Sequence, residues 1–165
     1  MGQKTLKKTQ AARRLESLGL TYELVPYEPG PLLSAVEAAD SLNLPQDIVY
    51  KTLLLRGDRH GLLEACLPAA EELDLKALAK ATGDKSVALT TVKELTALTG
   101  YLRGGCSPLG GLKDFPVYLD EAIMTKDKIA INAGARGLMF LLRPQDLLRA
   151  TQGILAPIAK KPLNK

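Results

Sequence analysis

The chain has 165 residues, the size of one compact domain with a substantial buried core. Hydrophobic residues make up 46% of it and charged residues 24%, a balance typical of a soluble globular protein. No apolar run reaches the length of a membrane span, and the basic start leads into an amphipathic helix rather than a signal-peptide core. The composition therefore excludes a membrane protein and predicts one cytoplasmic domain over residues 1–165.

The net charge of +4 is unevenly distributed along the chain. Residues 1–14 and 149–165 together hold nine basic residues and no acid, so the part between them carries −5. Basic ends on an acidic body either steer a polyanion toward the protein or act as solvated tails that keep it in solution.

Periodicity and capping residues predict the elements in chain order. Apolar positions at Ala11, Leu15 and Leu18 predict a first helix, and alternation at Tyr22 and Leu24 predicts a short strand. Helices are then expected after the capping residues Ser34, Asp74 and Thr91 and over 145–151, and strands over 48–56, 61–67, 87–89, 116–119, 128–133 and 138–142. Because these elements intermingle without a regular βαβ repeat, the sequence predicts an α+β fold with a mixed sheet.

Conventional catalytic groups are scarce. His60 is the only histidine and lies in a predicted hairpin turn, which disfavours Ser-His-Asp and Cys-His machinery. Cys66 and Cys106 lack CxxC spacing and nearby histidines, so we expect reduced thiols and neither a disulfide nor a zinc site. Carboxylates such as Glu71 and Glu72 have no partner at a metal-binding spacing. We therefore expect no metal and no cofactor.

Lys51 interrupts an apolar run. In a strand it shares one face with Val49 and Leu53. Two interpretations follow: the ammonium projects into an apolar pocket and holds a phosphate or carbonyl oxygen, or it lies at the strand edge with its head in water.

Two glycine-rich segments, 104–111 and 132–137, are the other departures from ordinary patterning. The first lacks the lysine and hydroxyl residue of a P-loop, so it is either a plain turn or a backbone that presents N–H groups to a ligand. Within it, Cys106 has no basic neighbour in sequence and is expected to be a wall residue rather than a nucleophile. The flanks of the second are strand-like, which favours a turn between strands over a KH-type clamp.

Five motifs in order resemble the YbaK family, the free-standing relatives of the editing domain of bacterial prolyl-tRNA synthetases. They are Val49–Leu54, Leu73–Leu78, Thr99–Tyr101, Gly105–Gly110 and Ala133–Gly137. The resemblance covers a core of about residues 9–159. It implies an α+β fold with a mixed, partly barrel-like sheet surrounded by helices. It also implies a deacylase that removes a wrongly attached amino acid from tRNA, typically cysteine from the tRNA for proline.

The same resemblance implies a set of site residues. Lys51 is similar to the family's essential lysine, and Gly104 and Gly105 belong to the loop whose backbone positions the scissile carbonyl, so these three are the expected catalytic residues. The expected substrate-binding residues are Tyr22, Tyr27, Thr52, Cys106, Ser107, Pro108, Asn132 and Gly134. In the mechanism proposed for the family the substrate's own thiol attacks its carbonyl, so the protein supplies positioning and oxyanion stabilisation.

Departures from the family pattern leave the amino-acid specificity open. Asn132 stands where a serine is common, and Met139 and Phe140 stand where an acidic residue is usual. The alternatives are a deacylase for another small amino acid, such as alanine on the tRNA for proline, and a non-catalytic module that binds tRNA or a synthetase. Expected partners are aminoacyl-tRNA and prolyl-tRNA synthetase. The basic residues expected to contact the tRNA backbone are Lys4, Lys7, Lys8, Lys160 and Lys161.

Overall fold

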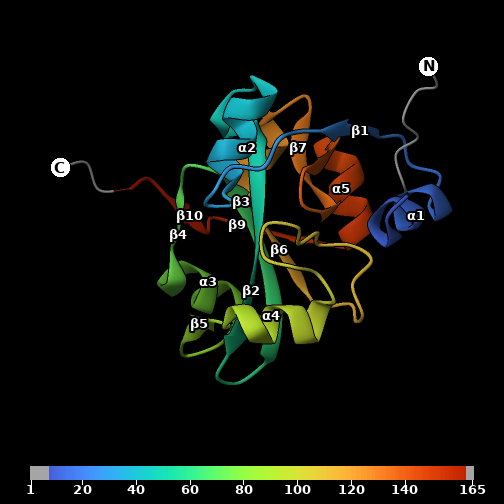
Figure 1. Ribbon diagram of the computed structural model, residues 1–165. Coiled ribbons are helices and arrows are strands. Elements are labelled where there is room, and N and C mark those ends of the chain that lie inside the picture. The colour runs from blue at the N-terminus through green and yellow to red at the C-terminus, as the bar shows by residue number, and fades with distance from the viewer. Residues whose placement is uncertain (1–7, 163–165) are drawn as a thin grey trace, which may run out of the picture.

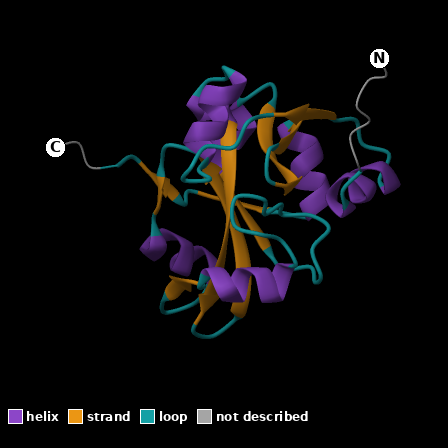
Figure 2. Cartoon of the chain, viewed as in Figure 1, coloured by secondary structure: helices purple, strands orange, loops and turns teal. Residues whose placement is uncertain are grey.

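The computed structural model describes residues 8–162, so Lys4 and Lys7 lie outside the described residues. The helices are α1 (Gln10–Ser17), α2 (Ala35–Leu42), α3 (Leu75–Thr82), α4 (Val92–Thr99) and α5 (Pro144–Thr151), with short 3-10 helices η1 (Gln46–Ile48) and η2 (Glu121–Thr125). The strands are β1 (Glu23–Pro26), β2 (Val49–Gly57), β3 (Gly61–Pro68), β4 (Glu72–Leu73), β5 (Val87–Leu89), β6 (Val117–Asp120), β7 (Ile129–Ala135), β8 (Leu138–Leu142), β9 (Ile154–Ala156) and β10 (Ala159–Lys160). Figures 1 and 2 show their arrangement.

Side chains at the helix starts fix where the helices begin. Ser34 and Thr91 each form a capping box with the glutamate three residues later, and these boxes begin α2 and α4. Asp74 accepts from the backbone N–H of Ala77 at the start of α3, and Pro144 occupies the first turn of α5. The helix starts predicted from sequence are thereby confirmed.

A long hairpin of β2 and β3 forms the centre of the sheet, whose strand order is β1-β8-β7-β2-β3-β6-β9. Along this order β2–β7, β3–β6 and β6–β9 are parallel pairs, whereas β1–β8, β7–β8 and β2–β3 are antiparallel. The predicted α+β fold with a mixed sheet is confirmed.

One edge of β2 is divided between two partners. β7 pairs with its first residues, Val49 and Tyr50, and β5 pairs with its last three, Leu55–Gly57. Between them, no strand of the described chain pairs with residues 51–54 on this edge, while β3 pairs with β2 throughout on the other. The sheet therefore has an opening beside the middle of β2.

Helices cover both faces of the β7–β8 part of the sheet. Alternate residues of β7 and β8, such as Ile131 and Phe140, pack against α1 and α5. Their neighbours Ala130 and Met139 pack against α2 on the opposite face. A third cluster joins α3 to the turn end of the β2–β3 hairpin. In Figure 1 α2 accordingly lies at the top of the molecule, α3 and α4 gather near the hairpin's turn at the bottom, and α1 and α5 lie to one side.

Three of the short strands were not predicted from sequence. β4, β9 and β10 have two or three residues each, too few to show an alternating pattern. Each forms by pairing with a strand that is distant in the sequence: β4 pairs with β10, and β9 pairs with β6. Within residues 8–162, none of the helices has the length and apolar character needed to cross a membrane.

Candidate active site

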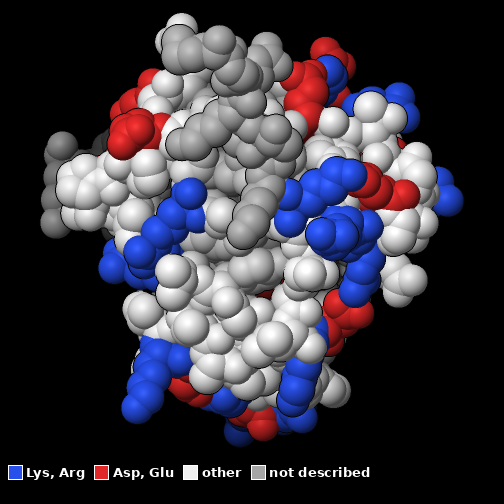
Figure 3. All heavy atoms as spheres, turned by 45° about the vertical axis from the view of Figure 1, so that its right-hand side comes forward, with Lys and Arg blue, Asp and Glu red and all other residues white. Residues whose placement is uncertain are grey.

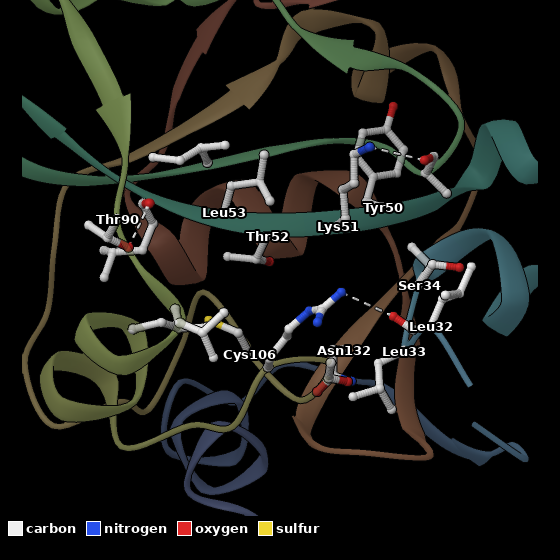
Figure 4. Close-up of a pocket in the computed structure, with 18 of the residues that line it drawn as sticks. Leu32, Leu33, Ser34, Tyr50, Lys51, Thr52, Leu53, Thr90, Cys106 and Asn132 are labelled. Carbon is white, nitrogen blue, oxygen red and sulfur yellow. Dashed lines mark hydrogen bonds between the residues drawn. The ribbon is translucent and has the colours of Figure 1, made fainter. Parts of the chain in front are cut away.

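A cavity of about 400 Å³ opens at the unpaired edge of β2. Most of its walls come from four segments: residues 50–54 of β2, the 103–106 loop, the 27–35 segment that leads into α2, and residues 89–95 at the start of α4. Ala69, Asn132 and Met139 complete them. Of the residues expected at the site, six line it: Tyr27, Lys51, Thr52, Gly104, Cys106 and Asn132. In Figure 4 Thr52, Cys106 and Asn132 lie on one side of β2, and Lys51 points to the other side.

Lys51 lies in the cavity wall, half-buried. Its ammonium donates to the carbonyl oxygens of Ala69 at 3.1 Å and Glu71 at 2.7 Å. Burial lowers the pKa of Lys51, and the nearby carboxylates of Glu72 and Glu71 oppose that shift. An ammonium has three protons, and two of them have acceptors among residues 8–162.

Thr52 and Cys106 present polar groups to the cavity from opposite sides. Figure 4 shows Thr52 on the side of β2 opposite to Lys51, toward Cys106 and Asn132. Behind them lie two buried side chains of β3: the Thr52 hydroxyl is 3.6 Å from the Cys66 sulfur, and the Cys106 thiol is 3.9 Å from the Glu64 carboxyl. Burial raises the pKa of Cys66 to about 12 and also raises that of Cys106. Neither thiol is a thiolate at neutral pH, as expected for wall residues.

The glycine loop approaches its neighbours more closely than a side chain would allow. Gly104 has φ +82°, and a Cβ there would lie 2.8 Å from the Cβ of Leu33. Gly105 packs against the backbone of residues 135–136. Ser107 and Pro108 are buried beneath the loop, where the Ser107 hydroxyl accepts from the N–H of Leu109. Gly105, Ser107 and Pro108 therefore support the loop without lining the cavity.

The second glycine segment meets the first through Asn132. Its buried carboxamide donates to the carbonyl of Gly104 at 3.0 Å, which joins β7 to the loop. Gly134, with φ +99°, lies under the ring of Tyr101, where a Cβ would come within 3.0 Å of the ring. It contacts that ring rather than the cavity.

Tyr22, which was expected to bind substrate, does not line this cavity. Tyr22 packs edge-on against Phe140, with ring centroids 5.1 Å apart, and its hydroxyl donates to Glu16. It thus joins the core under α1, whereas Tyr27 lies on the α2 side and lines the cavity. The two positions differ by five residues, and an odd separation in extended chain directs side chains to opposite faces, a signal that could have excluded Tyr22.

Two charged residues, one in the cavity wall and one behind it, were missed from sequence. Glu64 is 4% exposed and stands in the apolar strand β3, so the argument applied to Lys51 would have found it. Arg103, which precedes the glycine loop, lines the cavity and donates to the carbonyl of Leu32 at 3.4 Å. Among residues 8–162, no three His, Cys, Asp or Glu side chains are grouped to hold a metal ion.

Fold and cavity define an α+β domain that offers a ligand the ammonium of Lys51, the guanidinium of Arg103, a backbone loop and neutral polar side chains. Residues 30–150 match the model of the aminoacyl-tRNA editing domain. The chain belongs to this family.

Individual relatives agree with this assignment. The chain is 41% identical over 159 residues to the Enterococcus faecalis protein named "Putative Cys-tRNA(Pro)/Cys-tRNA(Cys) deacylase EbsC", covering 96% of this chain and 97% of that protein. It is 31% identical over 106 residues to the proline–tRNA ligase of Shouchella clausii, covering 64% of this chain and 18% of the ligase. A solved structure described as "a putative trans-editing enzyme for prolyl tRNA synthetase" superposes with a TM-score of 0.78 at 25% identity, covering 93% of this chain and 99% of that one.

Proposed function

We propose that this protein is a trans-editing deacylase that hydrolyses the aminoacyl ester of mischarged Cys-tRNA(Pro) in the cytoplasm. One observation carries the proposal: Lys51 and the glycine loop line one cavity in a chain that is 41% identical, along nearly its whole length, to a protein named as a deacylase of cysteinyl-tRNA. The relationship to a proline–tRNA ligase supports the tRNA for proline as substrate and prolyl-tRNA synthetase as partner.

The residues of the cavity suit a reaction in which the substrate supplies the nucleophile. The cysteinyl sulfur attacks its own carbonyl carbon, the bond from that carbon to the ribose oxygen breaks, and the thiol proton passes to the ribose oxygen. Water then opens the cyclic thioester to free cysteine. Backbone N–H groups of the loop stabilise the oxyanion, and Lys51 holds a phosphate or sugar oxygen near the 3′ end of the tRNA. The raised pKa of both protein thiols supports the assignment of the nucleophile to the substrate.

The test is single-turnover hydrolysis of the tRNA for proline charged with cysteine, serine, alanine or proline. We expect the cysteinyl ester to be cleaved fastest and the seryl ester far more slowly, because a hydroxyl is a much poorer nucleophile than a thiol near neutral pH. Preferential cleavage of the alanyl ester would instead make the protein an alanine deacylase. Binding without hydrolysis of any ester would make it a non-catalytic tRNA-binding module.

Two variants serve as controls in the same assay. Lys51→Met removes the charge-assisted contact and should lower the rate roughly ten- to a hundredfold in a folded protein. The double variant Cys66→Ser/Cys106→Ser should keep most of the activity. If the double variant is inactive although it binds cysteinyl-tRNA normally, the nucleophile belongs to the protein and the proposed mechanism is wrong.

A further inference from the structure

The carboxamide of Asn132 uses its whole hydrogen-bonding capacity within the protein. Its nitrogen donates to the carbonyls of Gly104 at 3.0 Å and Ala135 at 3.1 Å, and its oxygen accepts from the N–H groups of Gly134 at 2.7 Å and Ala135 at 3.1 Å. Two protons and two lone pairs are all that an amide side chain offers. Asn132 therefore has no remaining group with which to bind a substrate directly.

These four hydrogen bonds join an irregular point of the sheet to the glycine loop. The register of β7 against β8 shifts between Asn132 and Ala135, so residues 133 and 134 bulge from the ladder. Asn132 closes this bulge with three of its hydrogen bonds and reaches across to Gly104 with the fourth.

Two further contacts join the glycine loop to the chain that follows the bulge. Nε of Arg136 donates to the carbonyl of Arg103 at 2.8 Å. A Cβ on Gly105 would lie 3.0 Å from the nitrogen of Arg136, so this loop residue rests directly on the backbone after the bulge. The carbonyls of both Arg103 and Gly104 are thus fixed by residues of the β7–β8 turn.

The consequence concerns the N–H groups of the loop. The N–H of Gly105 donates to the carbonyl of Leu102 at 2.8 Å and is therefore occupied. Those of Gly104 and Cys106 have no acceptor among residues 8–162, and both residues line the cavity. A loop whose carbonyls are fixed while these two donors remain unused is suited to receive a developing negative charge.

We infer that Asn132 is a positioning residue that acts through the Gly104–Cys106 backbone, whose N–H groups at Gly104 and Cys106 stabilise the oxyanion of the reacting ester. The inference rests on the proposed function for the identity of that ester. A serine at this position has one hydroxyl proton, so Asn132→Ser cannot donate to the loop and to the bulge at once.

The first experiment separates binding from chemistry by single-turnover hydrolysis of cysteinyl-tRNA(Pro) over a range of protein concentrations. Asn132→Ala and Asn132→Ser should lower the chemical rate roughly a hundredfold, the effect of misplacing an oxyanion donor. The dissociation constant should stay nearly unchanged, because the interaction is made in the transition state. A folded Asn132→Ala protein with the wild-type chemical rate would overturn the inference.

Asn132→Asp adds a measurement, the pH dependence of the rate, which would not change if Asn132 had a purely structural role. Its ionised carboxylate keeps the acceptor toward Gly134 and repels the carbonyl of Gly104, whereas its protonated form can donate to that carbonyl. Its rate relative to wild type at the same pH should therefore rise as the pH falls. A constant ratio across pH would contradict the inference.

The second experiment does not depend on hydrolysis. Amide hydrogen exchange in the peptide that spans 102–107 should be faster in Asn132→Ala, and less so in Arg136→Ala, than in wild type. Arg59→Ala, which removes an exposed guanidinium at the far end of the β2–β3 hairpin, should leave it unchanged. If the wild-type protein hydrolyses no ester, the proposed function is wrong and exchange alone decides whether Asn132 fixes the loop. Unchanged exchange in Asn132→Ala would overturn the inference in either case.

Discussion

Glu64 is a carboxyl group buried behind the cavity with few partners. It is 4% exposed, and its hydrogen-bond partner is the Cys106 thiol, a weak donor at 3.9 Å. Burial, with a further contribution from the charge of Asp114, raises the pKa of Glu64 from 4.5 to about 8. At neutral pH the Glu64 carboxyl behind the cavity is therefore mostly protonated and uncharged.

This pKa predicts how stability depends on pH. Between about pH 4.5 and 8 the folded protein holds a proton at Glu64 that the unfolded chain has released, so stability falls as the pH rises through that window. Glu64→Gln removes the effect. At pH 8 we expect its free energy of unfolding to exceed that of wild type by roughly 2–4 kcal/mol, and the difference to vanish near pH 4.

Urea denaturation at a series of pH values measures this difference. Glu121→Gln, the same change at an exposed position, is the matched control and should follow wild type at every pH. Parallel curves for wild type and Glu64→Gln would mean that Glu64 is ionised in the folded protein.

At the scale of elements, the segment between β1 and α2 is held in place by one carboxylate. Glu37 accepts from the N–H groups of Leu32 at 3.1 Å and Ser34 at 2.9 Å. Between them Leu33 has φ +56°, a left-handed conformation that costs a leucine about 1–2 kcal/mol. The contacts of Glu37 offset this strain and hold Leu33 against Gly104 at the cavity wall.

Gly30 gives this arrangement a testable consequence. A Cβ at Gly30 would overlap the carboxylate of Glu37, which would have to leave its capping position. Gly30→Ala should therefore lower the free energy of unfolding by about 1 kcal/mol, the value of a helix cap. In a Glu37→Ala background the same change should be neutral or stabilising, since Gly30 does not have a positive φ.

A double-mutant cycle from thermal or urea unfolding gives the coupling between the two positions. Additive effects of Gly30→Ala and Glu37→Ala would show that the carboxylate does not occupy the space beside Gly30.

The elements that could be predicted from sequence are those whose signals are local. Ser34, Asp74 and Thr91 begin helices through bonds made within three residues, and β2 and β3 are long enough to be recognised as strands. β4 and β10 exist because residues 72–73 and 159–160 meet after a long excursion of the chain, which no local pattern records.

The candidate site likewise has features that a local sequence pattern predicts and features that it does not. Lys51 and the glycine loop stand out because each breaks a local pattern, and the structure brings them to one cavity. The hydrogen bond of Asn132 to Gly104 joins residues 28 positions apart, so its geometry could not be read from either segment alone. Tyr22 and Tyr27, treated alike by composition, are separated by the two faces of the sheet.

At the scale of the whole molecule, the elements that adjoin the two basic ends of the chain lie in different places. α1 and β10 lie on opposite sides of the structure (Figure 1). Lys8 forms an ion pair with Glu16, whereas Lys160 is opposite Glu72 in the β4–β10 pair, close in sequence to Glu71, whose carbonyl holds Lys51. On the face that Figure 3 shows, Lys and Arg side chains of residues 8–162 lie near Asp and Glu side chains.

We therefore predict that the carboxyl-terminal lysines contribute more to tRNA binding than Lys8 does. Lys160→Ala/Lys161→Ala should weaken binding of every tRNA alike and flatten its salt dependence by about 0.7–0.9 in log affinity per log salt for each phosphate that is no longer neutralised. Lys8→Ala should have a smaller effect. The measurement is tRNA affinity across a salt series, and an unchanged slope in the double variant would identify these lysines as solubilising residues only.

The divided edge of β2 has a consequence for how this scaffold can change. β7 and β5 pair with the two ends of one continuous strand, so the distance between them is counted in residues: the four positions of β2 between these pairings span about 13 Å. The stretch of β2 between the β7 and β5 pairings can lengthen only by whole residues. One added residue would turn Lys51 or Thr52 to the wrong face, whereas two would preserve both and add nearly 7 Å. Redesign for larger esters is thus more practicable by altering the loops than by altering the strand that joins them.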